Sequence, residues 1–132
     1  MGTVLRGMFV GESLFLLMLA AGSLTASAAS SSLSYKDTSA SADLDCSFNW
    51  QIFGSDDATA TTDKSSGSYP VAVRLELWKT KSSCSMSKYD SDSSYAQCVY
   101  SYSDVYCYQS RHSIDNKSHT TEYAVKALKE VD

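Results

Sequence analysis

Two histidines, His112 and His119, are the side chains of this sequence best suited to acid–base chemistry, because an unperturbed imidazole titrates near neutral pH. Both lie in the polar stretch 110–121, and Asp104 and Asp115 are the carboxylates available to orient them. The sequence contains no G-x-S-x-G turn, no H-E-x-x-H pair and no phosphate-binding glycine loop. We therefore predict a non-catalytic protein without a cofactor, in which both histidines occupy an exposed loop.

Acidic residues give only weak indications of a metal site. The run that starts at Asp90 alternates Asp with Ser, as the beginning of a calcium loop does. An EF-hand loop counted from there needs Gly at its sixth position and Glu at its twelfth, where this chain has Tyr95 and Ser101. A second acidic segment, 56–63, could hold a divalent cation only loosely. We expect solvated turns at both places and no bound metal.

The four cysteines are Cys46, Cys84, Cys98 and Cys107, separated by 38, 14 and 9 positions. These spacings contain no close pair of the kind that a zinc site needs. An even number of cysteines in a short exported chain indicates two disulfides, for which three connectivities exist. Cys98 and Cys107 would be diagonal to each other in a hairpin of residues 95–110, so we expect Cys46 to pair with one of them and Cys84 with the other. Of these two arrangements we favour Cys46–Cys107 with Cys84–Cys98, because a Cys84–Cys98 bond can join adjacent strands.

Aromatic side chains are the candidate ligand contacts. Residues 95–110 are rich in tyrosine, whose flat ring and hydroxyl can stack on a sugar or anchor a protein partner. Trp78 is predicted to lie opposite the apolar face of its strand, where an exposed indole suggests a binding contact. We therefore predict that Trp78, Tyr95, Tyr106 and Tyr108 contact a ligand, with packing of part of the tyrosine cluster in the core as the alternative.

Alternation of apolar and polar residues predicts the strands that position these side chains. Segment 44–52 has one apolar face, made of Leu44, Cys46, Phe48, Trp50 and Ile52. Segment 69–80 has another, made of Val71, Val73, Leu75 and Leu77. Residues 95–110 are predicted to form a hairpin that turns at Ser103-Asp104. Residues 120–131 fit a helix or a strand, and we predict a strand because the rest of the chain is β.

Three polar segments lie between or before these strands. Residues 29–42 are predicted to be a Ser/Ala-rich arm, with at most a short edge strand near residues 33–35. Residues 54–68 and 81–93 are predicted to be loops, the second with a short strand near residues 84–86. Short strands, polar loops and two disulfides together predict an all-β fold, a small antiparallel sandwich or barrel.

The first 28 residues have the layout of a secretory signal peptide. Arg6 supplies a positive charge, residues 13–22 form a short apolar run, and residues 26–28 (Ala-Ser-Ala) have the small side chains that cleavage requires. An uncleaved anchor is the alternative, but the run is shorter than a membrane-spanning helix needs. We predict a helical signal peptide over 1–28, the arm over 29–42, one β domain over 43–132, and a secreted protein without a membrane anchor.

Length and charge limit the kinds of partner that we expect this protein to bind. The 132 residues have room for one domain, and a net charge of −4 with a pI near 5.0 argues against binding to nucleic acid. The sequon at Asn116 matters only in a host that glycosylates. We predict a secreted, disulfide-stabilised binding module for an extracellular protein or glycan. The alternative is a secreted effector, either an inhibitor that uses loop 79–92 or an antimicrobial, bacteriocin-like protein.

Overall fold

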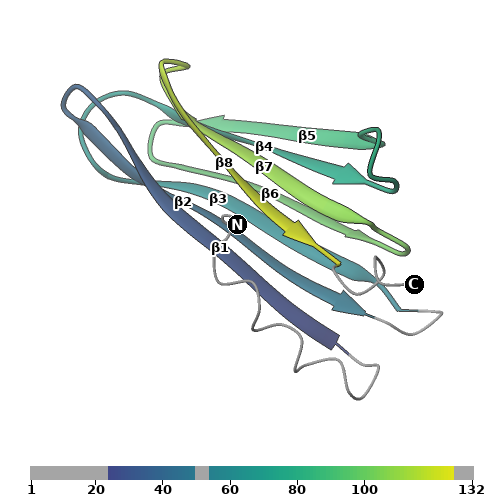
Figure 1. The fold of residues 1–132 in the computed structure, drawn as a ribbon. Coiled ribbons are helices and arrows are strands. Elements are labelled where there is room, and N and C mark those ends of the chain that lie inside the picture. The colour runs from purple at the N-terminus through teal and green to yellow at the C-terminus, as the bar shows by residue number, and fades with distance from the viewer. Residues whose placement is uncertain (1–23, 50–53, 127–132) are drawn as a thin grey trace.

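The computed structural model describes residues 24–49 and 54–126, and these residues form eight strands and no helix (Figure 1). No helix in these ranges is long and apolar enough to cross a membrane. The strands are β1 (Leu24–Tyr35), β2 (Thr38–Asn49), β3 (Asp56–Ser66), β4 (Val71–Trp78), β5 (Met86–Asp92), β6 (Tyr95–Tyr102), β7 (Cys107–Ile114) and β8 (Ser118–Val125).

The strands form two antiparallel sheets, with the orders β1-β2-β3-β6 and β5-β4-β7-β8. The sheets pack face to face with their strands nearly aligned (Figure 1), which is the arrangement of a β-sandwich. The predicted all-β antiparallel fold is therefore confirmed. The predicted signal-peptide helix falls mainly on residues outside the described ranges, and residues 24–28 belong to β1.

The core lies between the sheets, where the two strongest apolar patterns are confirmed. Leu44, Cys46 and Phe48 of β2 are buried, as are the four alternating apolar residues of β4, Val71, Val73, Leu75 and Leu77. The predicted continuation of the first pattern, Trp50 and Ile52, lies outside the described residues. Burial of alternate side chains from both sheets supplies the main driving force for folding.

Two segments predicted to be an arm and a loop are strands instead. Residues 29–35 belong to β1 and residues 38–42 to β2, with a turn at residues 36–37, and residues 54–68 contain β3. Their inward positions are occupied largely by small side chains, such as Ala42 and Ala60, which are fully buried. Alanine and serine alternate here with little contrast in hydropathy, so the period of two was present in the sequence but weak.

The predicted loop 81–93 contains β5, for a different reason. All of its side chains from residue 86 to residue 92 are exposed or half-buried, so it shows no apolar pattern. It is held as a strand by its backbone pairing with β4, from Leu77↔Met86 to Val71↔Asp92.

The predicted hairpin of residues 95–110 is also wrong. β6 pairs with β3, whereas β7 pairs with β4 and β8, so residues 103–106 cross from one sheet to the other. Asp104 has φ of 56°, the left-handed conformation that this change of direction uses. Seven of the eight residues of β7 are buried, which a strand achieves in the middle of a sheet and not at its edge.

The last described segment is a strand, as predicted, over Ser118–Val125. Tyr123 and Thr121 lie on its exposed face, while Ala124 and Glu122 are buried. The predicted strand extended further, but Lys126 already lies after β8, and residues 127–131 lie outside the described residues.

The structure does not support the predicted disulfides, because all four thiols are free and no pair lies at bonding distance. Cys46 and Cys98 point into the core from β2 and β6. Cys107 alternates with the core residue Tyr108 and so lies on the outer side of β7, away from Cys46. Cys84 lies in the exposed connection before β5.

Candidate functional site

His112 lies in the core, which corrects its predicted place in an exposed loop. Its Nδ1 is 2.8 Å from the hydroxyl of Thr62, and its Nε2 is 2.7 Å from the hydroxyl of Ser110. The Thr62 hydroxyl donates to the carbonyl of Ala72, so it accepts from Nδ1–H. The Ser110 hydroxyl then donates to Nε2. Both ring nitrogens are satisfied in the neutral imidazole.

The Ser110–His112 pair has the hydrogen bond of a nucleophile and its base but not their access to substrate. Both side chains are fully buried. Burial lowers the pKa of His112 to about 4, which makes the imidazole a weak base. A substrate could reach Ser110 only by separating the sheets, so we interpret the pair as part of the core. His119 is exposed at the start of β8.

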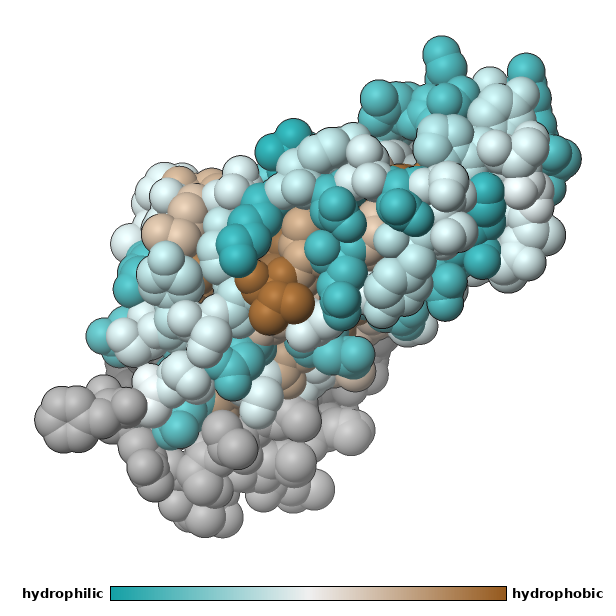
Figure 2. Space-filling model, turned by 180° about the vertical axis from the view of Figure 1, so that it is seen from behind, coloured by the Kyte–Doolittle hydropathy of each residue, from teal (hydrophilic) through white to brown (hydrophobic). Residues whose placement is uncertain are grey.

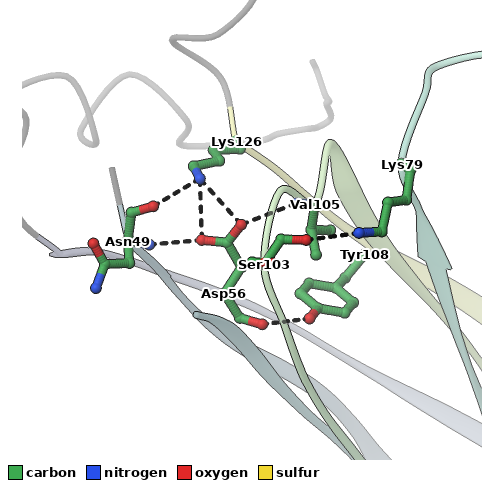
Figure 3. Close-up of polar contacts among 7 residues, drawn as sticks. All are labelled: Asn49, Asp56, Lys79, Ser103, Val105, Tyr108 and Lys126. Atoms are coloured by element: carbon green, nitrogen blue, oxygen red, sulfur yellow. Dashed lines mark hydrogen bonds and ion pairs between the residues drawn. The ribbon is translucent and has the colours of Figure 1, made fainter. Parts of the chain in front are cut away.

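A buried ion pair joins the two sheets at one end of the sandwich (Figure 3). Lys126 Nζ lies 3.0 and 3.1 Å from the two carboxylate oxygens of Asp56 and donates to the carbonyl of Asn49 at 2.7 Å. The same carboxylate accepts the backbone N–H groups of Asn49 at 2.7 Å and Val105 at 3.0 Å. The Tyr108 hydroxyl donates to the Asp56 carbonyl at 2.5 Å.

This network connects the end of β2, the start of β3, the crossover before β7 and the residue after β8. Lys126 and Asp56 are both buried, and each has several partners at hydrogen-bonding distance. A buried charge is tolerated when it is paired and hydrogen-bonded in this way, and loss of either partner would leave the other charge buried and uncompensated. In the sequence Asp56 and Lys126 resemble ordinary surface charges, and no local pattern marks them as partners.

The thiols are not activated for chemistry. Burial raises the pKa of Cys46 well above its usual value and that of Cys107 to about 12. Burial also raises the pKa of Cys98 and of the exposed Cys84. All four are therefore protonated at neutral pH, whereas a nucleophilic cysteine requires the thiolate.

The acidic run at residues 90–92 is used to close an edge of the sandwich. Asp90 accepts the backbone N–H of Gln97 at 2.9 Å, and Asp92 accepts that of Tyr95 at 3.1 Å. Hydrogen bonds from the backbone N–H groups of Ser94 and Tyr95 lower the pKa of Asp92. The carboxylates thus satisfy donors of the edge strand β6. Among the described residues no group of three or more His, Cys, Asp or Glu could hold a metal ion.

Aromatic and charged side chains gather on the outer face of the β5-β4-β7-β8 sheet. The strand register places Tyr89, Arg74 and Arg111 side by side in one row. The next row contains Glu76, Gln109 and Tyr123, and Trp78 follows Glu76 on the same face of β4. We call this surface the outer aromatic face, defined by Arg74, Glu76, Trp78, Tyr89, Gln109, Arg111 and Tyr123.

Glu76 organises the outer aromatic face. One of its carboxylate oxygens accepts the indole N–H of Trp78 at 3.1 Å and the amide N–H of Gln109 at 3.2 Å. The other lies 3.9 Å from Nε of Arg111. The indole of Trp78 is half-buried and oriented by its hydrogen bond to Glu76, so this face carries an aromatic ring beside polar groups.

Two exposed tyrosines flank this centre. Tyr89 is 54% exposed and Tyr123 is 55% exposed. The guanidinium of Arg74 lies 5.3 Å from the ring centroid of Tyr89, within the range of a cation–π contact. Tyr89 and Tyr123 were not among the predicted contacts, because each lies on a strand that could be oriented only once its pairing was known.

The structure places the four predicted ligand contacts in different environments. Trp78 lies on the outer aromatic face, as its position in the alternating pattern suggested. Tyr95 is 48% exposed but lies on β6 of the other sheet, and Tyr106 is half-buried just before β7. Tyr108 is fully buried, stacked between Phe48 and Tyr100, so it packs in the core and cannot touch a ligand.

The outer face of the β1-β2-β3-β6 sheet is mainly polar. It carries serine, threonine and four aspartates, Asp43, Asp45, Asp57 and Asp63, and its edge strand β6 exposes Tyr95 and Val99. The side of the molecule seen in Figure 2 is mainly hydrophilic, with one small, strongly hydrophobic spot near its centre. The described part of that side exposes no broad apolar patch.

Comparisons with protein-family models, with curated proteins and with solved structures find no match to this chain.

Proposed function

We propose that this chain is a secreted, non-catalytic binding module that holds a glycan on its outer aromatic face. The observation that carries this proposal is the contact of Glu76 with Trp78, Gln109 and Arg111, which fixes an indole on an otherwise polar surface. Glycans are recognised by flat aromatic rings that pack on the sugar face, together with polar groups that bind the hydroxyls. Export is supported by the layout of the first 28 residues.

The spacing of the rings suits an extended ligand. Tyr89 lies on β5 and Tyr123 on β8, three strand spacings apart, which corresponds to roughly 14 Å. Trp78 lies on β4, between these two strands. A ligand of several sugar units could contact all three rings, whereas a single sugar could contact only one or two.

A glycan is favoured over a protein ligand by the polarity of this face. The centre of a stable protein interface is apolar and depleted in charged residues. Here the centre contains Glu76, Gln109 and Arg111. Such a surface can exchange water for sugar hydroxyls while its own polar groups stay hydrogen-bonded.

The inhibitor alternative has no supporting observation. Its candidate segment, residues 79–92, consists of an exposed connection followed by β5, and Cys84 within it is a free thiol. A protease inhibitor needs a rigid, braced loop, and the expected disulfide brace is not present.

Trp78→Ala tests the proposal. The full chain is screened on a glycan array, and the affinity for any bound glycan is then measured by calorimetry. We expect Trp78→Ala to weaken binding at least tenfold, because it removes the fixed ring. Tyr95→Ala is the matched control, an exposed aromatic on the other sheet, and should bind as the unmodified chain does.

Two results would refute the proposal. One is the absence of binding to every glycan on the array. The other is equal affinity of Trp78→Ala and the unmodified chain, with thermal melting showing that both are folded. If no glycan on the array binds, the remaining candidate ligand is a protein that contacts Trp78.

A further inference from the structure

Arg74 and Arg111 are direct cross-strand partners on the outer aromatic face. Both are exposed, and the side chain of Arg111 is 60% exposed. Like charges in directly opposite positions destabilise a sheet, so such positions usually carry opposite charges or neutral residues. This pair therefore needs a physical explanation.

The face itself only partly compensates the two charges. Glu76 lies 3.9 Å from Arg111, and its other oxygen is used by Trp78 and Gln109. The Arg74 guanidinium lies over the ring of Tyr89. This face thus presents two guanidinium groups with one carboxylate beside them.

We propose that Arg74 and Arg111 together bind the anionic substituent of an acidic glycan, its carboxylate or sulfate. This inference rests on the proposed function and names the class of glycan. A guanidinium has a planar fork of donors that matches the oxygens of such groups, and two adjacent forks can hold one anion from two sides. The Arg74–Tyr89 contact also places an aromatic ring next to the anion site, where a sugar ring can pack.

The distribution of charge over the molecule favours the same orientation. The chain has a net charge of −4, and the opposite outer face carries Asp43, Asp45, Asp57 and Asp63. An acidic polymer is repelled by that face and attracted to the arginine pair. Nucleic acid is a poorer fit, because its binding requires many phosphate contacts and this face offers two guanidinium groups.

The test compares an acid with its neutral ester. The probes are oligogalacturonate, its fully methyl-esterified form and a sulfated heparin oligosaccharide, with the unmodified chain, Arg74→Gln, Arg111→Gln and the double variant. Lys117→Gln is the control, because it removes one positive charge from an exposed turn on another part of the molecule.

We expect the unmodified chain to bind a charged probe at least tenfold more tightly than the neutral ester. The preference should shrink with added salt and fall to near one in the double arginine variant, while Lys117→Gln keeps it. The arginines are exposed and adjacent, so thermal melting should show no loss of stability when either is replaced.

The outcomes separate this inference from the proposed function. Binding of the neutral ester that depends on Trp78 but shows no preference for charged probes would overturn the anion site alone. The anion site would also be overturned if the double arginine variant kept the preference for charged probes over the neutral ester. Absence of binding to any of these probes and to every glycan on the array would overturn both proposals.

Discussion

His112 is expected to make the free energy of unfolding depend on pH between 6.5 and about 4. The imidazole is fully buried, and its Nε2 accepts a hydrogen bond from Ser110. A second proton on the ring would place a charge in the core and turn the Ser110 hydroxyl away. Replacement by glutamine (His112→Gln) removes the titration and keeps a polar group at this position.

The size of the effect follows from the pKa. Burial lowers the pKa of His112 from 6.5 to about 4, against the smaller, opposite influence of the Asp43 carboxylate. The unfolded chain therefore takes up this proton as the pH falls through 6.5, and the folded chain does so only near pH 4. One pKa unit corresponds to 1.36 kcal/mol, so the free energy of unfolding should fall by roughly 3 kcal/mol between these limits. Well above pH 6.5 the imidazole is neutral in both states and contributes no pH dependence.

Urea denaturation at several pH values between 8 and 4 measures how the free energy of unfolding changes with pH. Carboxylates titrate in both proteins, so the difference between the unmodified chain and His112→Gln isolates the imidazole. The unmodified chain should be more stable at pH 7.5, and its advantage should shrink by roughly 3 kcal/mol towards pH 4. Parallel stability profiles would refute the reasoning. His119→Gln, at an exposed position, is the control for loss of a histidine.

Two further predictions concern the core. Lys126→Met should lower the free energy of unfolding by about 3–5 kcal/mol, because it leaves the Asp56 carboxylate buried without its cation. In urea denaturation the double variant Asp56→Asn/Lys126→Met should lose less than the sum of the two single variants, and additive losses would contradict a coupled pair. For the thiols, a colorimetric thiol reagent should react rapidly only with Cys84 in the folded protein and with all four cysteines after unfolding. Rapid reaction of a second thiol in the folded protein would show that the buried cysteines are accessible.

Large apolar side chains made part of the fold predictable. The alternation from Leu44 to Phe48 and from Val71 to Leu77 predicted which faces of two strands are buried, and the structure confirms both. Those patterns are strong because each inward residue differs sharply in hydropathy from its outward neighbours. The same alternation placed Trp78 on the outer side of β4.

Strands built from small or polar residues were missed. In β3, Ala58 and Ala60 alternate with Thr59 and Thr61, and this contrast is too small to separate a strand from a loop. β5 has no apolar pattern and exists because β4 offers it a backbone to pair with. In both cases tertiary contacts and not local sequence decide the structure.

The candidate site was predictable only in part for a related reason. Trp78, Arg74 and Glu76 share one face of a predicted strand, so their proximity follows from a period of two. Tyr89, Arg111 and Tyr123 come from three other strands, and their places depend on which strands pair and in which register. The chain crosses between the sheets at residues 103–106 and does not form the expected hairpin. This crossover makes β7 the neighbour of β4 and so determines where Arg111 lies.

The sequence by itself determined that alternating side chains would form strands with one buried side, because that property is local to each segment. Only the tertiary structure decided that His112 is buried, that Asp56 meets Lys126 and that two arginines lie side by side. Each of these depends on contacts between segments far apart in the chain, and the free energy of such contacts exists only after the sheets have assembled.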